Sequence, residues 1–413
     1  MNDERENIQS WSFPFCPMPP DWRLSWERIQ AQCDWIQAMR DTPQDPLFHA
    51  EGDVLIHTRM VAEALIVLDE WRALPQEERE ALFAAALLHD VAKPACTVVE
   101  PDGRISSKKH ARKGESLARE ILWRGIGLDT PAARAPAAEG AGACGNWVPA
   151  VSPAARAPAP FAQRERIAKL VRYHGLPLWF LEKSAPERAV IEASQTVRLD
   201  RLALLAEVDV RGRICADQQA LLGRIELFRE FCQEQRCYHG PRSFANAQSR
   251  FLFFRGEGRD PEYTAYDDSR FEVVLMAGLP GVGKDRWIAE HCSDWPIVSL
   301  DRLRQDLKIA SEAQQGRVIQ VAKEQARALM RKQQFFVWNA TNVTRLLRSQ
   351  LIDFFTSYHA RVRIVYVEAP FDEMLRRNAA RPNPVPEAVI YRLMRKLEVP
   401  DLTEAHVVEW ISS

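Results

Sequence analysis

One glycine-rich stretch of the chain has the composition and spacing of a phosphate-binding loop. An apolar, β-branched run begins at Phe271 and leads into a turn, which a helix-like segment follows. Backbone N–H groups of such a turn can point at phosphate oxygens, and a lysine at its end reaches the β- and γ-phosphates. We therefore expect ATP or another NTP to bind here, with a chance glycine-rich turn as the alternative. The nucleotide-binding residues would be Gly278, Gly281, Gly283, Lys284 and Asp285.

Asp285 departs from the usual pattern of this loop. A Ser or Thr normally follows the lysine, and its hydroxyl ligates Mg²⁺. Asp285 would have to bind the ion as a carboxylate, bind it through water, or leave the role vacant. We still expect Mg²⁺ to accompany the nucleotide.

Two pairs of residues further along have the spacing of a phosphoryl-transfer site. Asp301 follows a short apolar run and Arg304 stands three residues later, so both can face one cleft. Asp301 could accept the proton of an attacking hydroxyl and Arg304 could hold an acceptor phosphate, although a capping aspartate beside a surface arginine has the same pattern. Arg377 and Arg381 would share a helix face and could close over a triphosphate, or simply form a basic helix end.

A set of histidines and aspartates in the first half of the chain has the chemistry of a metal site. His89 and Asp90 end an apolar helical stretch, and imidazole and carboxylate groups together suit divalent transition metals such as Mn, Co, Ni or Zn. A single His-Asp pair is more often structural, so the prediction of one or two ions depends on further ligands. The chain has nine histidines, and the other candidates at helix-compatible places are His57, His110, His174 and Asp209.

Apolar periodicity predicts that residues 1–237 form a helical domain. Ala, Pro and Gly dominate residues 126–163, a composition that predicts a disordered insertion. Residues 238–270 have mixed composition and are expected to be a linker. The helical patterns cover residues 21–39, 55–68, 77–88, 109–123 and, with breaks, 164–237.

Residues 271–413 alternate short apolar runs with helical patterns, which predicts a parallel sheet covered by helices. The fold class is therefore multidomain: an all-α domain followed by an α/β domain. After the run at Phe271, strands are predicted at 297–299, 335–339 and 362–368. Helices are predicted at 303–308, 312–331, 345–358, 372–380 and 387–397.

Bulk composition narrows the classes of function. The 413 residues exceed one ordinary core, and 55 Lys and Arg balance 56 Asp and Glu, so nucleic-acid binding would rest on a local patch. Eight cysteines without a CxxC pair predict reduced thiols. Neither a signal-peptide core nor a run of about eighteen apolar residues occurs, which favours a cytoplasmic protein with no membrane partner.

The histidine and aspartate set resembles the HD-domain metal-dependent phosphohydrolases. The similarity is strongest at 88–94 (LHDVAKP) and 209–213 (DVRGR), which are similar to the HD domains attached to some tRNA nucleotidyltransferases. The resemblance implies that His57, His89-Asp90 and Asp209 hold one metal, that His110 and His174 hold a second, and that a metal-activated water hydrolyses a phosphoester. Phosphate contacts, or merely solvated charges, would be Lys93, Lys113 and Arg213.

The second half resembles the phage-type 5′-OH polynucleotide kinases. The similarity runs through 278–285, Asp301-x-x-Arg304, Thr341-Asn342 and Arg377-Asn-x-x-Arg381. It implies that Lys284 binds phosphates, that Asp301 is the general base, that Arg304 contacts the phosphate 3′ to the accepting hydroxyl, and that the last two arginines belong to a lid. Ala340 stands where those kinases have an aspartate.

An HD domain followed by such a kinase is similar to the bacterial HD-domain–polynucleotide kinase end-healing enzymes. This resemblance implies a 5′-OH kinase and a 2′,3′-phosphatase acting on RNA or DNA ends, possible opening of 2′,3′-cyclic phosphate, and a downstream ligase as a partner. Two alternatives stay open: an HD nucleotidase fused to a small-metabolite kinase, and a nucleotide sensor that binds without transferring phosphate.

Overall fold

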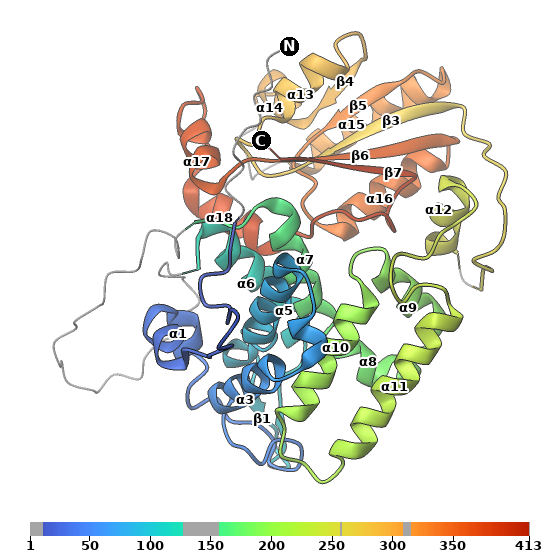
Figure 1. Ribbon diagram of the computed structural model, residues 1–413. Helices are drawn as coiled ribbons and strands as arrows, with labels where there is room; N and C mark the ends of the chain where they lie inside the picture. The colour runs from blue at the N-terminus through green and yellow to red at the C-terminus, as the bar shows by residue number, and fades with distance from the viewer. Residues whose placement is uncertain (1–10, 127–156, 257, 309–314, 413) are drawn as a thin grey trace, which may run out of the picture. The chain divides into compact units, whose positions relative to one another are not determined.

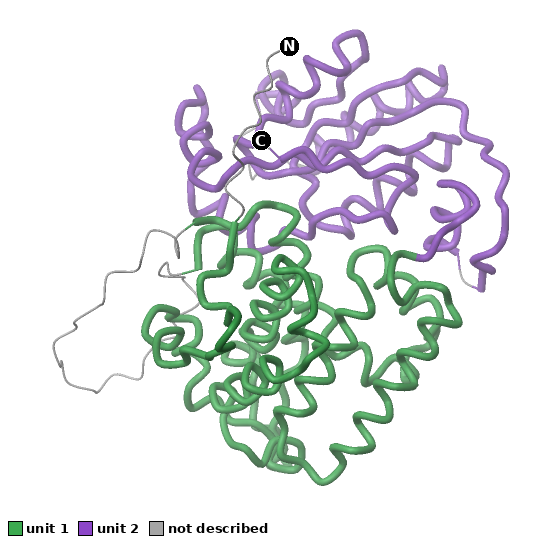
Figure 2. The backbone as a smooth tube through the Cα atoms, in the orientation of Figure 1, with its two compact units in different colours: residues 1–241 green, residues 242–413 purple. Residues whose placement is uncertain are grey.

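The computed structural model describes residues 11–126, 157–256, 258–308 and 315–412. Contacts divide the chain into two compact units, residues 1–241 and residues 242–413 (Figure 2). Among the described residues, no helix is both long and apolar enough to cross a membrane. The two units are described separately below.

In the residues that the structure describes, unit 1 consists of helices and loops with one short antiparallel hairpin (Figure 1). Helix α5 contributes much of its core, because the residues from Ala81 to Leu88 are buried on every side of the helix. It packs against α3, α7 and α10, and α6 packs along α7. The bounds are α1 Trp26–Gln32, α2 Asp34–Gln37, α3 Val54–Ile66, α4 Asp69–Arg72, α5 Gln76–Leu88, β1 Val98–Val99, β2 Ile105–Ser106, α6 His110–Arg124, α7 Phe161–Tyr173, α8 Leu176–Trp179, α9 Pro186–Ser194, α10 Leu199–Arg211 and α11 Gln218–Glu234.

Two features of unit 1 differ from the sequence-based expectations. The single helix predicted over 21–39 is two short helices, because Cys33 between them has extended backbone (φ −121°, ψ 99°). The insertion predicted over 126–163 falls mostly on residues 127–156, which lie outside the described residues. Helix α7 already begins at Phe161, so the last residues of the predicted insertion belong to the helical domain.

Unit 2 contains a five-stranded parallel sheet, which confirms the predicted α/β class. The strand order is β4-β5-β3-β6-β7, and β3 is central and almost wholly buried, as expected for a parallel strand covered on both faces. Helix α16 packs on β6, α15 on β4 and α13 on β5. The bounds are β3 Phe271–Ala277, α13 Lys284–His291, β4 Ile297–Ser299, α14 Leu300–Asp306, α15 Gln315–Arg331, β5 Phe336–Asn339, α16 Arg345–Thr356, β6 Ala360–Glu368, α17 Phe371–Ala379, α18 Glu387–Lys396 and β7 Val407–Ser412.

The predicted linker 238–270 is not a simple passage between domains. It contains helix α12 (Ala247–Arg255), whose aromatic residues are buried within unit 2. Phe251 stacks on His406 with ring centroids 4.0 Å apart, and Arg250 donates hydrogen bonds to the carbonyls of Leu402 and His406. The burial of this aromatic run explains why the segment folds with the second unit.

Candidate metal centre and candidate nucleotide site

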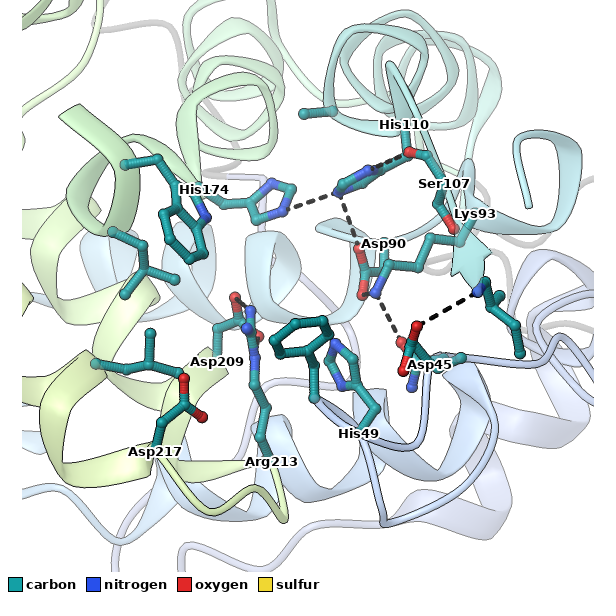
Figure 3. Close-up of a pocket in the computed structure, with 18 residues that line it drawn as sticks. Asp45, His49, Asp90, Lys93, Ser107, His110, His174, Asp209, Arg213 and Asp217 are labelled. Carbon is teal, nitrogen blue, oxygen red and sulfur yellow. Dashed lines mark hydrogen bonds and ion pairs between the residues drawn. The ribbon is translucent and has the colours of Figure 1, made fainter. Parts of the chain in front are cut away.

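The ends of several helices of unit 1 meet around a cavity of about 350 Å³ (Figure 3). His89 is the C-terminal cap of α5, His110 is the first residue of α6, and His174 caps the end of α7. Asp209 lies near the end of α10 and also lines the cavity. His57, within α3, is fully buried and does not line the cavity. All six predicted metal ligands, including Asp90, therefore converge on one region.

The six side chains form two clusters that share Asp90. In the first cluster, Nε2 of His57 lies 3.3 Å from Nε2 of His89 and 3.1 Å from Oδ1 of Asp209. Asp90 Oδ2 lies 3.1 Å from Nε2 of His89. Within each group of three (His57, His89 and Asp90; Asp90, His110 and His174), the ligand atoms lie within 4.8 Å of one another.

The second cluster uses the other oxygen of Asp90. Nε2 of His110 lies 3.4 Å from Asp90 Oδ1 and 3.2 Å from Nε2 of His174. Asp90 Oδ1 is buried and has no hydrogen-bond partner among the described residues. A carboxylate with one oxygen toward each cluster has the arrangement needed to bridge two cations.

The hydrogen bonds of the imidazoles turn their lone pairs toward the other predicted ligands. His89, His110 and His174 each have Nδ1 2.8 Å from a backbone carbonyl, those of Ala86, Ser107 and Val171. Since a carbonyl only accepts, we assign the proton of each neutral ring to Nδ1, which leaves Nε2 as a donor to a metal. Lone pairs facing one another at about 3 Å repel, and a cation between them removes that repulsion. The residues present therefore fit divalent metal ions.

The protonation equilibria of the cluster favour bound positive charge. Burial would raise the pKa of Asp90, but His89 and Lys93 hold it well below its usual range. Burial would likewise raise the pKa of Asp209, and Arg213 and His57 hold it low. Burial, together with the nearby His110, lowers the pKa of His174 to about 3. Asp90, Asp209 and His174 are therefore in the deprotonated forms that metal ligation requires. Burial would lower the pKa of His89, but Asp90 and Asp209 raise it, so His89 would release a proton when a metal binds.

Two cationic side chains lie beside the carboxylates, where they can meet a substrate phosphate. Lys93 Nζ is 2.7 Å from Asp90 Oδ2, and Nη2 of Arg213 is 2.5 Å from Asp209 Oδ2. Both line the cavity. Lys113, the third phosphate contact considered from the sequence, is exposed and does not line it.

Glu51 and His49 were not identified from the sequence. The Glu51 carboxylate is fully buried and lies 2.7 Å from His49 Nδ1 and 2.9 Å from His57 Nδ1, the second contact being close but not aligned as a hydrogen bond. Burial would raise its pKa, but contacts with His49 and His57 lower it. Glu51 is therefore an ionised carboxylate that orients His57, a predicted metal ligand. A signal in the sequence was the acidic residue six positions before His57, in the turn that precedes the helix.

The predicted phosphate-binding loop of unit 2 depends on its three glycines. Gly278, Gly281 and Gly283 have φ of +137°, +83° and +104°, values that side chains rarely adopt. A Cβ at Gly281 would lie 2.7 Å from the carbonyl oxygen of Met374, and one at Gly278 would clash with the carbonyl of Val367. The loop follows the central strand β3 and ends at the start of α13, where backbone N–H groups are free to face an anion.

Lys284 lies folded over this loop. Its Nζ donates hydrogen bonds to the carbonyls of Gly278 (3.0 Å) and Leu279 (2.8 Å). Burial lowers its pKa to about 8, although Asp285 and Asp301 act in the opposite direction. A triphosphate would supply the negative charge that this buried ammonium lacks.

Asp285 has a partner at the end of a neighbouring strand. Its Oδ1 accepts a hydrogen bond of 2.7 Å from the side-chain amide of Asn339, the last residue of β5. Both line a cavity of about 240 Å³ beside α13. Asn339 was not identified from the sequence, although the end of a parallel strand beside the loop is where such a residue is expected.

Asp301, Arg304 and Arg377 each pair with a neighbour on the same helix. Arg304 Nη1 lies 2.5 Å from Asp301 Oδ1, and the aspartate side chain is 65% exposed. Arg377 forms an ion pair of 2.5 Å with Glu373 of the same helix. A Cβ at Gly283 would lie 3.7 Å from Arg377 Nη1, so this arginine borders the loop. Arg381 follows α17 and is partly buried.

Comparisons with known proteins agree with this division of the chain. The family model of an HD domain matches residues 54–130, and that of an AAA domain matches residues 273–400. One similar solved structure, titled a "putative kinase" from Chloroflexus aurantiacus, is 13% identical, covers 35% of this chain and 89% of its own, and has a TM-score of 0.30. The chain therefore joins an N-terminal helical HD domain, with a His/Asp cluster that fits divalent metal, to a C-terminal P-loop domain of kinase-like α/β type.

Proposed function

We propose that the chain is a bifunctional enzyme that repairs nucleic-acid ends. The P-loop domain would transfer the γ-phosphate of an NTP to a 5′-OH end, and the HD domain would remove a 2′- or 3′-phosphate. The proposal depends on the position of Asp90, because each of its two oxygens faces a separate imidazole cluster. The same chain also has a predicted phosphate-binding loop. The products, 5′-phosphate and 3′-OH, are the ends that a ligase joins.

In the HD domain, the predicted ligands would hold two divalent ions that activate water and stabilise phosphate oxygens. Asp90 would be a ligand shared by both ions, since one of its oxygens faces each cluster. Lys93 and Arg213 would neutralise the remaining phosphate charge, since each lines the cavity and already contacts a carboxylate. A phosphomonoester fits this arrangement because it presents a terminal, dianionic group to several cations at once.

In the P-loop domain, Lys284 would leave the loop carbonyls and bind the β- and γ-phosphates. Asp301, at the start of α14, would accept the proton of the attacking 5′-hydroxyl, and Arg304 would hold the adjacent phosphate of the acceptor. Arg377, beside the loop, and Arg381 would neutralise charge on the transferring phosphoryl group.

Label transfer from γ-labelled ATP with Mg²⁺ to a short 5′-OH oligonucleotide tests this proposal. We expect transfer by the intact chain, with nucleosides and simple sugars as poorer acceptors, and release of phosphate from a matched 3′-phosphorylated oligonucleotide with Mn²⁺ or Co²⁺. Preferred transfer to a nucleoside or sugar would instead favour the small-metabolite kinase.

A nucleotide sensor is the second candidate for unit 2. It is favoured by Asp285, which is held by Asn339 in place of the usual hydroxyl residue. Tight NTP binding without transfer to any acceptor, unchanged in Asp301→Ala, would support the sensor and contradict the kinase.

A further inference from the structure

Part of the wall of the metal cavity is aromatic, which phosphate binding alone does not require. Two aromatic side chains, Phe48 and Trp179, line it together with the ligands and the two cations. Their residues are 47% and 39% exposed, so both rings meet solvent at the cavity rather than filling a core. An ion and a phosphate need charged and polar partners, and neither explains two solvent-facing aromatic rings.

Trp179 is held in place by an arginine. The guanidinium carbon of Arg224 lies 4.7 Å from the indole centroid, and its Nη1 donates a hydrogen bond of 3.3 Å to the carbonyl of Leu178. Leu178 itself is buried, which anchors the end of α8, where Trp179 is the last residue. An indole fixed in this way loses little conformational entropy when a planar ligand stacks on it.

Each aromatic ring lines the same cavity as a metal-site residue that is near it in the sequence. Trp179 follows His174 by five residues, and Phe48 directly precedes His49, the partner of Glu51. The cavity volume of about 350 Å³ is in the range of small-molecule sites rather than of a single ion. A ligand whose phosphate reaches Lys93 and Arg213 would therefore bring its remaining atoms against the aromatic rings.

We propose that Phe48 and Trp179 form a nucleobase platform, on which the base of the nucleotide carrying the 2′- or 3′-phosphate stacks. The platform rests on the proposed phosphatase function and specifies its substrate: a terminal nucleotide with a base, in preference to a bare sugar phosphate. Every base has a π-face, so stacking makes the site tolerant of sequence.

Two oligonucleotides test the platform, one with a 3′-phosphate on a terminal adenosine and one with the same phosphate on a terminal abasic residue. The intact chain should have a kcat/KM about 5- to 150-fold higher for the base-bearing end, the range that aromatic stacking provides. Trp179→Ala should lower kcat/KM for the adenosine end toward that of the abasic end and leave the abasic end unchanged. Trp179→Phe should retain part of the preference, and Phe48→Ala should reduce it.

Leu181→Ala is the matched control, because Leu181 is 55% exposed and near Trp179 but does not line the cavity. It should keep the full preference for the base. Equal kcat/KM for the two ends in the intact chain would overturn the platform. An equal loss on both ends in Trp179→Ala would also overturn it, since that result indicates a structural role.

A binding measurement separates the platform from the phosphatase. An oligonucleotide ending in 2-aminopurine nucleoside 3′-phosphate should lose fluorescence when it binds the full-length protein in EDTA, and Trp179→Ala should restore the fluorescence. Absence of quenching in the intact protein would contradict the platform. Phosphate release from none of the substrates would contradict the proposed phosphatase, while quenching that depends on Trp179 would still support the platform.

Discussion

The two candidate sites differ in how far their side chains are already arranged for chemistry. In the HD domain, five of the six predicted ligands are at most 5% exposed, and the six together come from five helices or helix ends and have their donor atoms close to one another. In the P-loop domain, Asp301 is exposed and paired with Arg304, Lys284 bonds to its own loop, and Arg377 pairs with Glu373. One site is assembled, and the other needs a ligand to rearrange its charges.

The difference follows from the chemistry expected of each site. Metal ions bind strongly only where several donors are held close together, so the packing of helices must overcome the repulsion of clustered imidazoles and carboxylates. A kinase site must open to admit and release nucleotide, and its charged groups find local partners between cycles. Four predictions test this contrast, in order of decreasing effect.

Removal of Asp90 should have the largest effect, because each of its oxygens faces one cluster. Asp90→Ala should lower phosphate release from a 3′-phosphorylated oligonucleotide by about 10³-fold or more and leave label transfer to a 5′-OH end unchanged. The control is Asp69→Ala, whose carboxylate on α4 is fully exposed. If Asp90→Ala abolished both activities while the circular dichroism spectrum stayed native, the two sites would not be independent.

Loss of Asp301 should act only on the kinase. Asp301→Ala should reduce label transfer by about 10²- to 10⁴-fold, the usual contribution of a general base. Asp294→Ala, an exposed carboxylate in the same unit, should transfer label normally. An unchanged rate in Asp301→Ala would mean that the Asp301–Arg304 pair only stabilises the start of α14.

Glu51 should tune the metal site without being a ligand. Glu51→Gln should weaken metal affinity by about 10- to 100-fold, since the neutral amide no longer stabilises His57 as a ligand. Titration calorimetry with Mn²⁺ measures this effect directly. Glu63→Gln, on the exposed side of α3 and paired with Arg59, is the control. Equal affinities in Glu51→Gln and the unchanged chain would leave Glu51 with a packing role alone.

NTP affinity should fall at alkaline pH because of Lys284. Burial lowers its pKa to about 8, so the free protein carries the ammonium at pH 7 and has largely lost it at pH 9. The apparent Kd for ATP should therefore rise by up to about tenfold between these values. Lys284→Arg, whose guanidinium stays charged, should bind ATP with a much flatter pH profile. A flat profile in the unchanged chain would show that Lys284 stays protonated throughout.

Sequence patterns predicted the elements whose apolar periodicity is strong. The helix predicted at 77–88 lies within α5, and the strand predicted at 297–299 matches β4. The alternation of strand and helix patterns after Phe271 predicted the parallel sheet. Strand β7 was not predicted, because its alternating buried and exposed residues are few and follow an irregular segment. The aromatic run in 238–270 gave no periodicity that separates a buried helix from a linker.

The residues of the candidate metal site could be proposed from the sequence because His and Asp are the residue types that such a site uses. The six ligands were proposed from His and Asp types, and the structure places their donor atoms together. Glu51 and Asn339 were missed because their roles depend on three-dimensional neighbours, His57 and Asp285, that lie on other segments. The pairing of Lys284 with its own loop also could not be predicted, since it depends on the fold of the turn.

One oligonucleotide that carries both a 5′-OH and a 3′-phosphate tests the central claim most directly. After incubation with NTP, Mg²⁺ and Mn²⁺, mass spectrometry of the product reports each end separately. The intact chain should add a 5′-phosphate and remove the 3′-phosphate, Asp90→Ala should only add, Asp301→Ala should only remove, and a mixture of the two variants should do both. If the mixture failed to convert both ends, or if either variant lost both activities while folded, the account of two independent phosphoryl-transfer sites would be wrong.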